Sequence, residues 1–204
     1  MERRRVIFAT NNQGKMKEIR TILQDTHLPI YSLKDLWIDI DIVEDGETYT
    51  DNALIKARAI HALFPDDIIL ADDSGIEIDY LNKEPGVQSA RFGGVDTPYA
   101  IKNQMFLDQL IGVSGDERSA RFVCVIAAVF PDGSEETCMA TMEGQIATEA
   151  KGENGFGYDP IFYVPEYQCT SAEMTEELKN ELSHRGKALR KMSHVILERI
   201  EDRY

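Results

Sequence analysis

Apolar and polar residues near the start of the chain change periodicity within a few positions. Val6 to Thr10 is a short apolar run that the polar stretch Asn11 to Gly14 ends, which indicates a buried strand followed by a turn. The apolar positions after the turn recur at helical spacing: Met16, Ile19, Ile22 and Leu23. A strand, a polar turn and a helix in this order are typical of the start of an α/β protein.

The same change of periodicity continues toward the middle of the chain. Isoleucines alternate with acidic residues over 38–42, which predicts a half-exposed strand. Residues 53–64 carry apolar side chains at helical spacing and predict a second helix. Residues 68–71 form another apolar run, a second buried strand, and they lead directly into Asp72-Asp73-Ser74-Gly75.

The second half of the chain adds strands that lie close in sequence. We expect a helix near 98–110, a long strand over 122–130 and an antiparallel return over 137–146 after a Pro-Asp-Gly turn. A short strand at 161–164 and two helices close the chain. The pattern predicts a single domain over residues 1–204, of the α/β class, with helices on the faces of a mixed β-sheet.

Composition excludes some classes of function. The 22 basic and 36 acidic residues give a formal net charge of −14, which repels polyanions, so we expect no nucleic-acid polymer as a partner. A small phosphorylated ligand stays possible, because a local cluster of Lys and Arg can bind it. The three cysteines show no metal-binding spacing, and no segment reaches membrane-spanning length or resembles a signal peptide. We therefore expect a cytoplasmic protein without a membrane partner.

The first candidate site is the loop between the first strand and the first helix. Its residues offer backbone N–H groups, a helix N-terminus and one positive charge to a phosphate: Thr10, Asn11, Asn12, Gln13, Gly14 and Lys15. The loop is not a Walker A motif, because Met16 stands where Ser or Thr is required. An ordinary turn with a solvated lysine is an equally good interpretation of this segment alone.

The second candidate site is the pair of acids at the end of the second buried strand. Asp72 and Asp73 are hard oxygen ligands of the kind that Mg²⁺ prefers, and ligands of α/β proteins bind at the carboxyl ends of strands. The alternative is a turn with both acids solvated. The acidic stretch 44–47 is by itself a solvated turn unless another carboxylate lies beside it.

Two later segments could bind a base. Phe156 lies between two glycines in Gly155-Phe156-Gly157-Tyr158-Asp159-Pro160, which leaves its ring accessible for stacking on a nucleobase. His184 and Arg185 begin a helix, where the dipole disfavours positive charge, so an acceptor-rich ligand would compensate them together with Lys179. The alternatives are a tight turn that buries its aromatic rings, and surface residues beside a helix cap.

Six ordered blocks resemble one family, the inosine triphosphate pyrophosphatases or XTP/dITP diphosphatases. The blocks are ATNNQGK at 9–15, EDGETYTDNALIKA at 44–57, ADDSG at 71–75, PGVQSARF at 85–92, GENGFGYDPIF at 152–162 and SHRGKAL at 183–189. The resemblance implies hydrolysis of ITP, dITP and XTP to the nucleoside monophosphate and pyrophosphate. Related alternatives are a pyrophosphatase for other modified or pyrimidine nucleotides, or a catalytically silent nucleotide sensor.

The resemblance also implies roles for individual residues. Asp73 looks like the general base and a ligand of Mg²⁺, Glu44 like a further metal ligand, and Asp72 like a member of the same carboxylate cluster. The 10–15 loop would hold phosphate. The remaining substrate contacts would be Ser74, Phe156, Gly157, Tyr158, Asp159 and Lys179, with His184 and Arg185 reading the purine 6-oxo oxygen. The resemblance further implies an elongated mixed α/β fold with a substrate groove between two lobes, and a homodimer.

Overall fold

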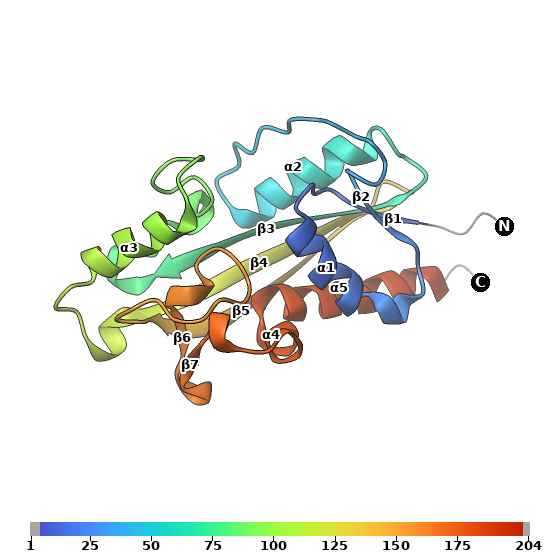
Figure 1. Ribbon diagram of the computed structural model, residues 1–204. Helices are drawn as coiled ribbons and strands as arrows, with labels where there is room; N and C mark the ends of the chain where they lie inside the picture. The colour runs from blue at the N-terminus through green and yellow to red at the C-terminus, as the bar shows by residue number, and fades with distance from the viewer. Residues whose placement is uncertain (1–4, 202–204) are drawn as a thin grey trace. The chain divides into compact units, whose positions relative to one another are not determined.

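The computed structural model describes residues 5–201 and shows a β-sheet flanked by helices (Figure 1). The strands are β1 Val6–Phe8, β2 Ile30–Ser32, β3 Ile68–Ile78, β4 Ser119–Val129, β5 Glu135–Ile146, β6 Phe162–Val164 and β7 Cys169–Thr170. The α-helices are α1 Gln13–Ile22, α2 Tyr49–His61, α3 Tyr99–Gln109, α4 Glu176–Leu182 and α5 His184–Glu201. Residues 38–46 adopt no regular structure, so the strand predicted over 38–42 is wrong.

The seven strands form one open mixed sheet in the order β2-β1-β3-β4-β5-β6-β7. β1 runs parallel to both of its neighbours, with Val6 opposite Ile30 of β2 and Ile68 of β3. β6 runs antiparallel to β5 and to β7. The presence of parallel and antiparallel strand pairs in one sheet confirms the predicted α/β class with a mixed sheet. β1 is fully buried, as a strand that pairs on both edges and is covered on both faces should be.

The chain divides into two compact units. Among the described residues, unit 1 comprises residues 5–73, 124–140 and 185–201, and unit 2 comprises residues 74–123 and 141–184. The long strands β3, β4 and β5 each contribute residues to both units. The prediction of a single domain over residues 1–204 stays a prediction.

Each unit has its own hydrophobic core. In unit 1, α1 and α5 pack their apolar side chains on the sheet face that carries Val6, Phe8, Ile68 and Leu70. Figure 1 shows α2 on the other side of these strands. In unit 2, apolar side chains from α3 and β4–β6 surround Tyr158 and Phe162. Within residues 5–201, no helix is long and apolar enough to cross a membrane.

Candidate functional site

The loop between β1 and α1 presents the start of a helix to solvent. Asn12 is the N-cap of α1, where its Oδ1 accepts a hydrogen bond of 3.1 Å from the Lys15 backbone N–H. Thr10 Oγ1 accepts one of 3.2 Å from the Asn12 N–H. Residues 11–14 are exposed, and the first turn of α1 has no acidic residue. An anion at this N-terminus would gain from the helix dipole without a competing carboxylate.

Asp72 and Asp73 are neighbours in sequence but lie in different surroundings. They are successive residues of β3, and successive side chains of a strand point to opposite faces of its sheet. Asp72 is 2 % exposed and binds two cations, with its Oδ2 at 2.9 Å from Lys15 Nζ and 3.4 Å from Arg185 Nε. Burial would raise the pKa of Asp72, but the charges of Lys15 and Arg185 outweigh burial and lower the pKa well below its usual value.

Arg185 links this carboxylate to α1. The Arg185 side chain is 4 % exposed, and its Nη1 lies 2.7 Å from Glu18 Oε2. Its guanidinium thus lies between two acids, and Lys15 supplies a second positive charge to Asp72. This buried ion network holds Lys15, from the phosphate-binding loop candidate, against the middle of β3. The prediction that the strand ends before Asp72 is wrong, because β3 continues through both acids to Ile78. Arg185 therefore lies in the acidic network of unit 1.

Asp73 lies on the side of β3 that faces α2. Asn52 Nδ2 donates to Asp73 Oδ2 at 3.2 Å, and Lys56 Nζ lies 3.8 Å from Asp73 Oδ1. Lys56 also binds Glu44, with Nζ at 2.5 Å from Oε2. Asn52 Oδ1 accepts from the Gly46 N–H at 2.9 Å, which fixes the acidic turn against the helix. Glu44 and Asp73 therefore converge on one ammonium group.

The surroundings of Asp73 make it a stronger base than an ordinary aspartate. Burial raises its pKa to about 6, and the negative charges of Glu44 and Asp72 act in the same direction. Lys56 and the Asn52 hydrogen bond oppose the rise without cancelling it. A carboxylate with this pKa is ionised at neutral pH and accepts a proton from water more readily than a solvated one.

The donor set fits a magnesium ion. Among the described residues, no three His, Cys, Asp or Glu side chains come together as a complete metal cage. Glu44 and Asp73 supply two hard carboxylate ligands that already share one cation. Mg²⁺ in nucleotide enzymes is typically bound by one or two carboxylates, with waters and substrate phosphates completing the shell. The carboxylate pair therefore suits a cation that a phosphorylated substrate brings or shares.

Unit 2 contains a second cluster of predicted site residues. Asp159 Oδ2 accepts from the Phe156 N–H at 2.8 Å and from Lys179 Nζ at 2.7 Å, while its Oδ1 accepts from Ser171 Oγ at 2.8 Å. Lys179 Nζ also lies 5.2 Å from the centre of the Phe156 ring, in cation–π contact. Asp159 is 4 % exposed, whereas Phe156 is 39 % exposed. The buried acid thus holds a loop whose aromatic ring stays accessible.

The glycine before Phe156 is required by this packing. Gly155 has a φ of +78°, and a Cβ atom there would lie 2.2 Å from Asp159 Oδ2 and 2.6 Å from Lys179 Nζ. Both the backbone conformation and the space therefore exclude a side chain. Tyr158, two residues after Phe156, is buried, and its hydroxyl donates to Ser89 O at 2.6 Å.

The remaining predicted residues, His184, Ser74 and Gly157, lie in unit 2. His184 is the first residue of α5 and stacks on Phe122 with ring centres 4.9 Å apart and planes at 20°. Ser74 follows Asp73 in β3 and belongs to unit 2, and Gly157 contributes its carbonyl to a contact with α3. The predicted site residues thus form two groups, a carboxylate and lysine group in unit 1 and an aromatic group in unit 2.

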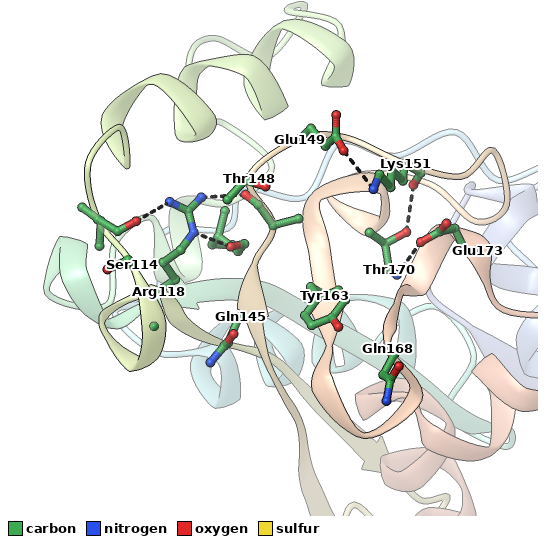
Figure 2. A pocket seen from close by; sticks show the side chains of 14 residues that line it. Ser114, Arg118, Gln145, Thr148, Glu149, Lys151, Tyr163, Gln168, Thr170 and Glu173 are labelled. Atoms are coloured by element: carbon green, nitrogen blue, oxygen red, sulfur yellow. Dashed lines mark hydrogen bonds and ion pairs between the residues drawn. The ribbon is translucent and has the colours of Figure 1, made fainter.

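A cavity of about 370 Å³ lies elsewhere in unit 2. Figure 2 shows Arg118 and Lys151 in its wall, with their charged groups turned toward partners. The Arg118 guanidinium donates to four backbone carbonyls, those of Leu110, Val113, Ile146 and Ala147, and Lys151 pairs with Glu149. With two basic and two acidic side chains in its lining, the cavity has no excess positive charge for a triphosphate.

Sequence reasoning missed three residues of the unit 1 group: Asn52, Lys56 and Glu18. Asn52 and Lys56 are four residues apart in α2, which places them on one face of the helix. That spacing was a usable signal, because both polar residues interrupt the apolar side of the helix. Glu18 gave no such signal, because its role depends on Arg185, which lies 167 positions later.

Comparison with known proteins shows what the chain is similar to. The sequence model of the Ham1 family matches residues 6–195. A dITP/XTP pyrophosphatase of Clostridium perfringens is 45 % identical over 194 residues, covering 93 % of this chain and 95 % of that protein. One of Desulforamulus reducens is 46 % identical over 192 residues, covering 94 % of this chain and 95 % of that protein.

Solved structures show the same fold. The Staphylococcus aureus Ham1 protein aligns with a TM-score of 0.85 at 36 % identity, over 96 % of this chain and 100 % of that one. A HAM1 protein from Coxiella burnetii aligns with a TM-score of 0.86 at 40 % identity, over 96 % and 99 % of the two chains. The family match, the identity and the near-complete coverage lead to one conclusion: the chain belongs to the Ham1 family.

Proposed function

We propose that the protein is a Mg²⁺-dependent pyrophosphatase that hydrolyses ITP, dITP and XTP to the nucleoside monophosphate and pyrophosphate. The observation that carries the proposal is Asp73, a carboxylate with a pKa raised to about 6 that shares Lys56 with Glu44. Relatives named dITP/XTP pyrophosphatases, 45 % and 46 % identical over nearly the whole chain, support the substrate class.

Residues of unit 1 account for the phosphate chemistry. Lys15 and the exposed N–H groups of residues 11–14 would bind phosphate oxygens. Glu44 and Asp73 would hold the metal, which when bound neutralises phosphate charge and makes water more acidic. The Asp73 carboxylate would accept a proton from the water that hydrolyses the bond between the α and β phosphates. A third metal contact from Asp72 stays a prediction, because Lys15 and Arg185 already bind its Oδ2.

Residues of unit 2 account for base recognition. The exposed ring of Phe156 would stack on the purine, with Lys179 and Asp159 holding its loop. His184 would donate to the 6-oxo oxygen, and Arg185 is proposed as the second donor. Adenine carries a 6-amino group, which leaves such donors unpaired at a cost of about 1–3 kcal/mol each. Ser74, Gly157 and Tyr158 complete the proposed substrate contacts. We further propose a cytoplasmic homodimer that binds neither nucleic-acid polymers nor membranes.

Phosphorus NMR of the purified protein with a nucleotide panel tests the proposal. ITP, dITP and XTP should release pyrophosphate with Mg²⁺ and not with EDTA, while ATP, GTP, CTP and UTP stay nearly intact. Release of orthophosphate, or a preference for pyrimidine nucleotides, would show that the reaction or the substrate class is wrong. Binding of ITP without cleavage would instead identify a nucleotide sensor.

Variants at neighbouring positions test the proposed roles. Asp73→Asn should abolish turnover and leave nucleotide binding largely intact. Glu44→Gln should raise the Mg²⁺ concentration needed for half-maximal activity. Asp45→Asn is its matched control, because Asp45 is exposed in the same turn and loses the same charge. An equal response of the two variants would remove Glu44 from the proposed metal site.

A further inference from the structure

Helix α3 holds the loop that carries Phe156 through a buried amide. Asn103 is 4 % exposed, and its Nδ2 donates to the Gly157 carbonyl at 3.2 Å. The two residues are 54 positions apart, so the bond ties the helix to a distant loop within unit 2. Asn103 Oδ1 has no hydrogen-bond partner among residues 5–201.

The Gly157 carbonyl lies in a part of the loop where two glycines flank Phe156. Phe156 lies between Gly155 at φ +78° and Gly157 at φ +70°, and neither glycine has a side chain that could anchor the backbone. Before the ring, the Phe156 N–H is fixed by Asp159. After it, the Gly157 carbonyl is fixed by Asn103. The Phe156 carbonyl also accepts from the Asp159 N–H at 3.4 Å, so Asp159 and Asn103 hold the backbone on the two sides of the ring.

The neighbouring residues of α3 hold the same region together. Lys102, 1 % exposed, donates to the Ala90 carbonyl at 2.8 Å, and Ser89 O in turn accepts from the Tyr158 hydroxyl. The Tyr99 ring packs edge-on against Tyr158 with centres 5.1 Å apart. Two consecutive buried polar residues of α3 therefore reach two loops that are also bonded to each other.

We propose that Asn103 is a positioning residue for nucleotide binding, which acts through the Gly157 carbonyl to fix the Phe156 ring for the base. The inference rests on the proposed function, since it assigns the base to Phe156. A buried amide that makes one of its possible bonds adds little stability over an apolar side chain of similar size. The benefit of Asn103 is therefore the position of the loop, which affects binding of the base and leaves the chemistry at Asp73 unchanged.

The test compares Asn103→Leu with Gln104→Leu, its matched control. Gln104 is the next residue of α3 and loses a similar amide bond, to Asp108 at 2.7 Å, on the exposed face. Asn103→Leu should raise KM for ITP about five- to tenfold, as expected for one lost hydrogen bond, with kcat nearly unchanged. Amide hydrogen exchange over residues 155–159 should accelerate in the same variant. Gln104→Leu should change neither quantity.

Hydrogen exchange separates this inference from the proposed function. If the wild type hydrolyses no nucleotide of the panel, the proposed function fails, and exchange over 155–159 still decides whether Asn103 positions the loop. Unchanged exchange and KM in Asn103→Leu would overturn the inference, as would a loss of kcat at constant KM. If that variant does not fold, Asn103→Asp keeps the side-chain volume, removes the donor and should give the same two results.

Discussion

The buried ion network around Asp72 makes a quantitative prediction for the variant Asp72→Asn. Asn keeps the shape of Asp but removes the charge that Lys15 and Arg185 share. Removing one partner of a buried ion pair costs about 3–5 kcal/mol, because an uncompensated charge remains. Arg185 retains Glu18, so we expect the lower end, about 3 kcal/mol of unfolding free energy. For a chain of this size the melting temperature should fall by about 6–12 °C.

Urea unfolding in EDTA without nucleotide measures the effect. The matched control is Asp79→Asn, because Asp79 also makes a two-point contact with an arginine, Arg121, but its side chain is 38 % exposed. That variant should lose less than about 1 kcal/mol. In the double variant Asp72→Asn with Arg185→Met, the loss should be smaller than the sum of the two single losses, because the orphaned guanidinium is gone.

The pH dependence supplies a second check. The pKa of Asp72 is lower in the folded protein than its ordinary value of 3.8. The stabilisation is therefore present above pH 3.8 and is lost as the pH falls toward the lowered value. The stabilisation that Asp72 itself contributes should be present at neutral pH and shrink in acid below pH 3.8. If Asp72→Asn lowers the free energy of unfolding at pH 7 by less than about 1 kcal/mol, as the Asp79→Asn control does, the buried ion network does not stabilise the fold as predicted.

Two further predictions concern Asp73 and Gly155. Because burial raises the pKa of Asp73 from 3.8 to about 6, its ionisation destabilises the metal-free fold as the pH rises between these values. The free energy of unfolding of Asp73→Asn, relative to that of the wild type, should therefore rise by up to about 3 kcal/mol between pH 4 and pH 8 in EDTA. A pH-independent difference in urea midpoints would contradict the raised pKa. Gly155→Ala should lower the free energy of unfolding by about 1–3 kcal/mol and raise KM for ITP, because the added methyl group would collide with Asp159 and Lys179. Gly133→Ala has the same φ of +78° with nothing within 4 Å, so an equal KM in both variants would rule out the contact as the cause.

The sequence by itself determined the features that depend on local patterns. Apolar periodicity predicted the α/β class, the strand and helix at the start of the chain and the long strands near 122–146, because side-chain burial imposes periods of 2 and 3.6. The alternation over 38–42 failed, since a local pattern does not create a neighbouring strand to pair with. Local patterns and the motif blocks named Asp73, Lys15 and Phe156 as candidates, and the roles of these residues stay predictions.

Only the tertiary structure decided which partners surround each of these residues. The local pattern gave Asp72 and Asp73 only as a pair of adjacent acids, but the pleat of β3 turns one toward Lys15 and Arg185 and the other toward Asn52 and Lys56. The pKa values of the two acids move apart because burial and charge depend on partners that lie up to 113 positions away. Long-range contacts of this kind are set by packing in three dimensions, which local sequence patterns do not encode.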